Sequence, residues 1–293
     1  MTVNVYDLAK KYNLVIKGEI VDSIISGPSS LDNQKINTIS WVKNKKFLNK
    51  IKCGFVLINS SIDFESINGV IYLLTDKSVK ITFSKILKRY FVPEIDFYLK
   101  NFVNDHRKNK NIKISDNIFI GQNVKIGNGT IIFSNVVIEA NVNIGDNCVI
   151  KSHVSIGTEG LGLELDITSD KIISFPQIGN VILENNVEIG PNSTVRRGTL
   201  GSTIIKSETK IGSLVNIGHN CKIGKNCILT CNIVTGGSSS IGDYCFIGIN
   251  TVIKNSVKVG SKCTLGMGSV VTKDIKNNVV AYGIPAKAIR KNI

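Results

Sequence analysis

The stretch "NIGHNCKIGKNC", residues 216–227, places one histidine shortly before two cysteines in a repetitive tract. The chain has three histidines, and His219 is the one in this stretch. An imidazole titrates near neutral pH, so His219 could act as a general base. Together with the cysteines it could instead bind a metal, or it could be an ordinary surface residue of a repeat. The position of His219 within the repeat separates these three possibilities.

An aliphatic residue recurs at every sixth position from Ile114 to Ile156 and again from Ile205 to Val271, with Thr235 as the exception. A smaller residue follows four places after each of these anchors. The period fits neither an α-helix nor a simple alternating strand, and it is typical of a hexapeptide β-helix. We therefore expect a mainly β fold, a left-handed parallel β-helix of hexapeptide repeats, in which glycines take corner conformations that most residues avoid.

The cysteines fit this repeat as packing residues. Because the small position faces inward, thiols there should behave as small buried hydrophobes, and those one coil apart should stack. The five thiols at this position are Cys148, Cys221, Cys227, Cys245 and Cys263. The chain has no CxxC motif, and the spacing of His106 and His153 from His219 gives no ligand cluster. We expect no metal.

His219 comes two places after the anchor Ile217, which predicts an outward side chain that reagents can reach. One coil later, 18 residues along the chain, stands Gly237. A glycine there would let a ligand approach the backbone closely. An outward histidine of this kind could take a proton from an attacking amine, because its pKa lies near neutrality.

The remaining sequence divides the chain. Residues 1–105 lack the repeat and contain helical and buried-strand patterns, which predict a small α/β domain. The β-helix is expected over 106–273, with an insertion loop at 158–177 and a shorter slip at 196–203, and the tail over 274–293. Such insertions become loops outside a solenoid, often at its binding face.

The net charge and the hydropathy of the chain indicate which classes of ligand and which location to expect. The net charge of +14 suits anionic ligands such as nucleotide-sugars or coenzyme A, while no aromatic-plus-basic signature of nucleic-acid binding stands out. No apolar run is long enough to span a membrane, and the first residues lack a signal peptide. We expect a cytoplasmic protein without nucleic acid or membrane insertion.

Three segments resemble the UDP-3-O-acylglucosamine N-acyltransferase family of lipid A synthesis, in the same order along nearly the whole chain. "ISWVKNKKF" (39–47) is similar to that family's uracil-binding segment. "IGTEGLG" (156–162) followed by "FPQIG" (175–179) resembles its insertion loop, and "IGHNCKIG" (217–224) resembles its catalytic segment. The resemblance implies a homotrimer with sites between subunits.

The resemblance also implies residue roles. His219 would be the general base and the Gly237 N–H the donor to the oxyanion. Trp41 and Phe47 would sandwich a pyrimidine whose edge Asn44 reads, although the two rings could instead be core residues of a small domain. The other expected substrate-binding residues, from the segments near the family's active site, are Glu159, Arg196 and Asn220.

The chain departs from the family at several positions. Arg196 stands where the family has Asp, Gly201 and Ser202 replace later acids, and Ser256 replaces a histidine. The tail "YGIPAKAIRKNI" instead resembles that of coenzyme-A-dependent hexapeptide acetyltransferases. This implies a cofactor site, unless the cations form a solvated basic tail. Its residues would be Pro285, Lys287 and Arg290.

These features favour an acyl-CoA-dependent N-acyltransferase that modifies a UDP- or dTDP-linked amino sugar for cell-surface polysaccharide or lipopolysaccharide. The first alternative is the lipid A enzyme itself, with acyl carrier protein as donor. Sugar O-acetylation is a further possibility, because the same base could deprotonate a hydroxyl. A non-catalytic nucleotide-binding solenoid would bind nucleotide without turnover.

Overall fold

The computed structural model describes residues 2–167 and 169–292. The chain forms two compact units, the first made of Met1–Pro93 and Leu161–Gln177, the second of Glu94–Gly160 and Ile178–Ile293. The division falls at Pro93 rather than at the expected residue 105, and most of the inserted segment belongs to the first unit. The reason is local packing, since the insertion forms a hairpin against a helix of that unit.

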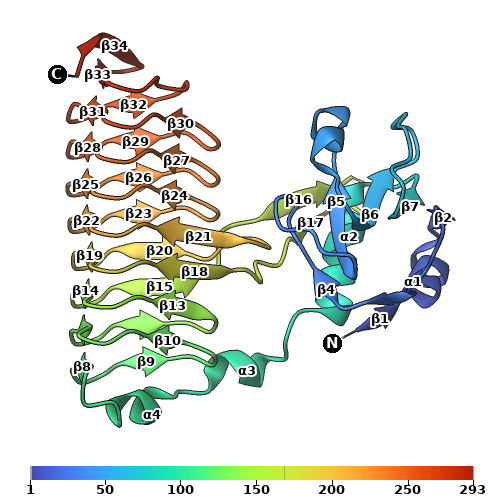
Figure 1. The fold of residues 1–293 in the computed structure, drawn as a ribbon, viewed down its shortest axis with the longest axis horizontal. Coiled ribbons are helices and arrows are strands. Elements are labelled where there is room, and N and C mark those ends of the chain that lie inside the picture. Colours follow the sequence, from blue (N-terminus) through green and yellow to red (C-terminus); the bar gives the residue numbers. More distant parts are fainter. Residues whose placement is uncertain (1, 168, 293) are drawn as a thin grey trace. The chain divides into compact units, whose positions relative to one another are not determined.

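The second unit is a stack of triangular coils whose short strands form three sheets with parallel pairing between coils (Figure 1). One sheet contains β10 (Lys125–Ile126), β13 (Val142–Ile144), β18 (Asn180–Leu183), β21 (Ser202–Ile205), β24 (Lys222–Ile223), β27 (Ser240–Ile241) and β30 (Lys258–Val259). Another contains β9 (Phe119–Ile120), β12 (Val137–Ile138), β15 (Ser155–Thr158), β20 (Thr194–Arg196), β23 (Asn216–Ile217), β26 (Val234–Thr235), β29 (Val252–Ile253) and β32 (Val270–Val271). The second unit is therefore the left-handed parallel β-helix that the hexapeptide repeat predicts.

The third sheet runs along the remaining side and ends in an antiparallel pair. Its strands are β8 (Lys113–Ile114), β11 (Ile131–Ile132), β14 (Val149–Ile150), β19 (Glu188–Ile189), β22 (Lys210–Ile211), β25 (Ile228–Leu229), β28 (Phe246–Ile247), β31 (Thr264–Leu265), β33 (Val279–Gly283) and β34 (Ala286–Lys291). The final hairpin leaves the hexads, as the sequence predicts, and pairs with the last coil through β31 and β33. It therefore covers the edge of β31, which would otherwise be open to another chain.

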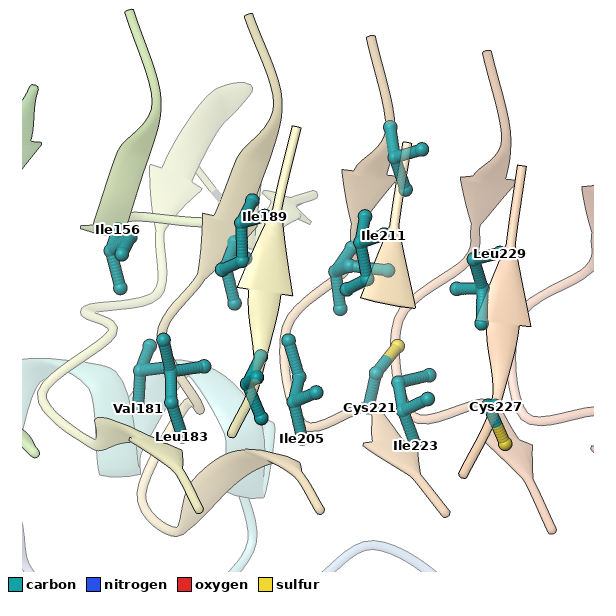
Figure 2. Packing of buried hydrophobic residues seen from close by; sticks show 14 of the residues in the cluster. Ile156, Val181, Leu183, Ile189, Ile205, Ile211, Cys221, Ile223, Cys227 and Leu229 are labelled. Carbon is teal, nitrogen blue, oxygen red and sulfur yellow. The ribbon is translucent and has the colours of Figure 1, made fainter. Parts of the chain in front are cut away.

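The core of the coils is narrow and continuous. The anchors of successive hexads point inward, among them Ile211, Ile223 and Leu229, and stack along the axis (Figure 2). The five cysteines predicted to face inward are all buried and free. Cys227 Sγ contacts the Gly242 carbonyl at 3.1 Å, so the thiol packs and also satisfies a backbone acceptor.

The corners correct one expectation about glycine. The left-handed conformation falls three places after each anchor, and asparagine usually occupies it, as at Asn226 (φ 54°). The glycines directly after the anchors are needed for space instead, because a Cβ on Gly121 would lie 2.5 Å from the Ala140 backbone N in the next coil. His153 takes an ordinary left-handed corner position (φ 61°), and its ring meets Asn135 at 3.4 Å.

The first unit is a small α/β domain, as expected. Its sheet has the order β2 (Val15–Lys17), β7 (Val70–Thr75), β6 (Gly54–Asn59), β5 (Thr38–Val42) and β4 (Gly27–Pro28). The other elements of this unit before the insertion are β1 (Val3–Asn4), α1 (Val5–Tyr12), β3 (Ile24–Ile25), the 3-10 helix η1 (Lys45–Lys50) and α2 (Val79–Tyr90). The helical patterns of this region correspond to α1 and α2, and the buried-strand patterns include β6 and β7.

The inserted segment is an antiparallel hairpin of β16 (Leu163–Asp166) and β17 (Lys171–Ser174). It packs on α2, where Lys80 Nζ bonds Glu164 Oε2 at 2.6 Å and the Ser84 hydroxyl donates to the Ser174 carbonyl at 3.0 Å. The segment that leads from Pro93 to the first coil lies in the second unit and contains α3 (Ile95–Leu99) and α4 (Val103–Arg107).

Candidate active site

The register of three neighbouring strands builds the corner around His219. Strand β20 pairs with β23 through Val195 and Ile217, and β23 pairs with β26 through Ile217 and Thr235. The residues that follow each strand are therefore stacked as well. His219 lies between the Arg196–Thr199 segment of the preceding coil and Gly237 of the following coil.

Gly237 lies directly against the imidazole. A Cβ at this position would come within 2.4 Å of His219 Nε2, so a residue with a side chain cannot occupy it without displacing the ring. The Gly237 carbonyl accepts a hydrogen bond from Ser256 N at 3.0 Å, whereas its N–H donates none within the described residues. The corner thus combines an imidazole nitrogen with an unused backbone donor.

The other ring nitrogen faces two polar groups. Asn220 Nδ2 lies 3.0 Å from His219 Nδ1, and Thr199 Oγ1 lies 3.5 Å from the same nitrogen. Asn220 occupies the left-handed corner position (φ 58°), and its Oδ1 accepts the Thr199 N–H at 2.8 Å. Its amide also donates to Thr199 Oγ1 at 2.9 Å. The side chain predicted to bind substrate is therefore engaged within the corner.

His219 is half-buried, and its surroundings keep the ring neutral. Burial lowers the pKa of His219 below the usual histidine value, and the positive charge of Arg196 lowers it further. A neutral imidazole can accept a proton, which is the first requirement of a general base. The outward position predicted for His219 is compatible with this partial burial.

Arg196 and Arg197 follow each other but lie in different environments. Arg196 is partly exposed, and its Nη1 reaches the Glu159 carbonyl at 3.5 Å. The Glu159 side chain itself is exposed. Arg197 is 1% exposed, donates to the carbonyls of Gly157 and Ala140, and pairs with Glu139 at 3.3 Å.

The sequence predictions did not include Arg197 or the two residues that contact it, Tyr98 and Glu139. The guanidinium lies over the Tyr98 ring at 5.8 Å, and burial raises the pKa of Glu139 although Arg197 opposes this. Arg197 enters at the point where β15 and β20 lose register beyond Ile156. The break in the hexads was visible in the sequence, but nothing in "RRG" shows which arginine would be buried. Thr199 was missed for the same reason.

The predicted pyrimidine site lies in the first unit. Trp41 is half-buried and packs with Phe83 (ring centroids 6.1 Å apart) and Phe175 (5.9 Å). Phe47 packs against the cluster that contains Val42, and consecutive residues of a strand point to opposite faces. The structure therefore does not bring the two rings together. Asn44 is exposed, and its side chain makes no capping hydrogen bond to η1.

The predicted cofactor residues belong to the terminal hairpin. Pro285 lies in its turn, and Lys287 and Arg290 lie on β34, all three exposed. Arg290 Nη1 bonds the neighbouring Lys291 carbonyl at 3.1 Å. The structure thus leaves both cations open to solvent.

The described residues, 2–167 and 169–292, lack two kinds of feature. No group of three or more His, Cys, Asp or Glu side chains is placed to hold a metal ion there. None of the helices in the same residues is long and apolar enough to cross a membrane.

Known proteins resemble this chain in its hexapeptide repeats and also over most of its length. Family models match residues 123–158, "Bacterial transferase hexapeptide (six repeats)", and residues 239–273, "Hexapeptide repeat of succinyl-transferase". The UDP-N-acetylglucosamine acyltransferase of Francisella novicida, a solved structure, is 26% identical with a TM-score of 0.54, covering 62% of this chain and 67% of that one.

Two curated relatives carry the same name. The UDP-3-O-acylglucosamine N-acyltransferase of Fusobacterium nucleatum is 37% identical over 250 residues, which are 78% of this chain and 74% of that protein. The enzyme of the same name from Lawsonia intracellularis is 53% identical over 64 residues, 22% of this chain and 18% of that protein. The chain therefore belongs to the UDP-3-O-acylglucosamine N-acyltransferase family and is an N-acyltransferase built on hexapeptide repeats.

Proposed function

We propose that the protein transfers an acyl group from an acyl carrier protein thioester to the amino group of a UDP-linked 3-O-acylated glucosamine. The sequence favoured acyl-CoA as donor, with the lipid A reaction as its alternative. The name of the Fusobacterium relative, which aligns with most of the chain, supports that alternative better. A cytoplasmic location remains a prediction.

The observation that carries the proposal is the contact between the His219 ring and Gly237. The neutral imidazole would take the proton of the attacking amine as its nitrogen forms a bond to the thioester carbonyl carbon. The unused Gly237 N–H would stabilise the oxyanion that develops. Collapse would break the C–S bond, and the proton held by the imidazole would pass to the departing thiolate.

Nucleotide binding is proposed for the first unit. Trp41 offers a partly exposed aromatic face beside Phe83 and Phe175, and aromatic faces stack readily on bases. The exposed Asn44 could hydrogen-bond a pyrimidine edge. In this structure Phe47 packs on the other side of the sheet, so its predicted part in a sandwich would require its ring to leave that position.

A homotrimer is proposed on the apolar outer surface of the coils. Ile228 and Phe246 are exposed on adjacent strands of one sheet, and Val234 and Val252 on adjacent strands of another. Rows of exposed apolar side chains on flat sheets favour association. Light scattering of the purified chain should give three times the monomer mass of 31.9 kDa, whereas a monomer would contradict the assembly.

The second candidate donor is acyl-CoA. Lys287 and Arg290 are exposed on β34, in the terminal hairpin of the β-helix, and could contact its phosphates. The test is to supply a UDP-linked amino sugar with either long-chain acyl carrier protein or the matching acyl-CoA and to analyse the product by mass spectrometry. We expect an amide formed with the carrier protein. Transfer from acyl-CoA alone would restore the second candidate, and an ester product would contradict N-acylation.

A further inference from the structure

The hydrogen bonds around His219 specify which ring nitrogen can carry the proton. The Thr199 N–H donates to Asn220 Oδ1 at 2.8 Å, which fixes the orientation of the amide. Its Nδ2 group, which can only donate, then faces His219 Nδ1 at 3.0 Å. Donation from this group to Nδ1 favours the neutral ring that carries its proton on Nε2.

That protonation state conflicts with the base proposed above. Nε2 is the nitrogen beside Gly237, where the reacting carbonyl would lie, and a base must present an unprotonated nitrogen there. The neutral ring can free Nε2 only by holding its proton on Nδ1. A proton on Nδ1 needs an acceptor, because burying it without one would be costly.

Thr199 provides the acceptor. Its Oγ1 lies 3.5 Å from Nδ1, and a hydroxyl oxygen has lone pairs that can receive an N–H. Asn220 could offer its own oxygen to Nδ1 only by rotating its amide, which would break the bond from the Thr199 N–H. The arrangement therefore places one acceptor and one donor beside the same nitrogen.

We propose that Thr199 is a positioning residue that selects the productive tautomer of His219, with its hydroxyl accepting the Nδ1–H and leaving Nε2 free to take the proton of the amine. This inference rests on the proposed function for its catalytic consequence. The tautomer itself is a property of the free enzyme and can be measured without turnover. Asn220 opposes this tautomer while its amide remains bonded to Thr199.

The test combines ¹⁵N NMR of the imidazoles with steady-state kinetics on the full chain. The chain has three histidines, so a His219→Gln variant assigns the resonances of that ring. Thr199→Val removes the hydroxyl but keeps the backbone N–H that holds Asn220. We expect the Nδ1–H form of His219 to disappear and kcat to fall about tenfold with little change in KM, because the ring is held in the wrong tautomer.

Three companion variants separate positioning from structure. Thr199→Ser should restore both the tautomer and kcat. Asn220→Asp replaces the amide donor beside Nδ1 with a carboxylate acceptor and should enrich the Nδ1–H form, alone or combined with Thr199→Val. Thr230→Val is the matched control, because that hydroxyl bonds the Ile247 carbonyl away from the histidine.

Each outcome decides the inference. Wild-type tautomer populations and kcat in Thr199→Val would overturn it, as would an unchanged tautomer in Asn220→Asp if the valine variant failed to fold. If the wild-type chain turned over neither donor, the proposed function would fail, while the NMR comparison would still judge the tautomer on its own.

Discussion

The β-helix contains regular coils, from Ile205 to Val271, and interrupted coils between Gly157 and Thr203. In the regular coils inward hydroxyls and thiols bond backbone carbonyls, as Thr209 does to Gly224 and Cys245 to Gly260. The buried side-chain atoms without a partner in the described residues all lie in the interrupted coils: Thr158 Oγ1, Arg197 Nη1 and Thr203 Oγ1.

The difference shows how a repeat acquires a site. An intact hexad satisfies its own polar groups through the next coil, so it leaves little for chemistry. An interruption admits a long side chain such as Arg197 and releases the following residues from the repeat. Thr199 comes from that interrupted segment and contacts His219, which itself stands in a regular hexad. Arg196 comes from the same segment, and its charge lowers the pKa of His219.

The largest expected effect is at the contact of Gly237 with His219, two residues of neighbouring regular coils. Gly237→Ala should lower kcat by about 100-fold or more, because the added methyl group occupies the space of the His219 ring and disturbs the neighbouring N–H. Initial rates of amide formation measure this. Gly27→Ala is the matched control, since a Cβ there meets nothing within 4 Å. Near-normal turnover in Gly237→Ala would separate Gly237 from catalysis.

The second effect concerns stability in the interrupted coils. Arg197→Met should lower the free energy of unfolding by about 2–4 kcal/mol, because two buried carbonyls and Glu139 lose their partner. Urea unfolding followed by circular dichroism measures the change. Lys222→Met on the exposed face of a regular coil should change it by less than about 0.5 kcal/mol. Equal losses in the two variants would remove the distinction between the coils.

The sequence predicted the regular coils far better than the interrupted ones. The inward positions of Cys227 and Ile217 follow from the period alone, because each coil repeats the environment of the last. The burial of Arg197 and the contact of Thr199 with Asn220 depend on how the chain crosses a gap, which no period describes. His219 and Gly237 were predictable because their 18-residue offset is a property of the repeat.

A third effect is expected on the pH dependence of kcat/KM. Arg196 and burial both hold the pKa of His219 low, so the ring remains neutral, and active as a base, to lower pH. Arg196→Gln removes one of these causes, so the folded pKa should rise and the acid limb of kcat/KM should move to higher pH. Measurements of kcat/KM against pH for the wild type and the Arg196→Gln variant check this shift. A limb that stays in place or moves to lower pH would show that Arg196 does not act on the base.

The smallest effect is expected among the buried cysteines that lie one coil apart, Cys227, Cys245 and Cys263. Cys245→Ser should cost only about 1 kcal/mol, because a hydroxyl can make the same bond to the Gly260 carbonyl that Thr209 makes to Gly224. Thermal and urea unfolding provide the measurement. A loss as large as that of Arg197→Met would show that the regular coils do not tolerate an exchange of polar groups.

His219 is proposed as the base for acyl transfer to a nucleotide-linked amino sugar. The most direct measurement compares kcat of wild-type and His219→Gln chains with the donor that the wild type uses, after circular dichroism shows that both are folded. We expect a loss of about 100- to 10,000-fold, the usual contribution of a general base. Wild-type turnover in a folded His219→Gln chain would contradict it.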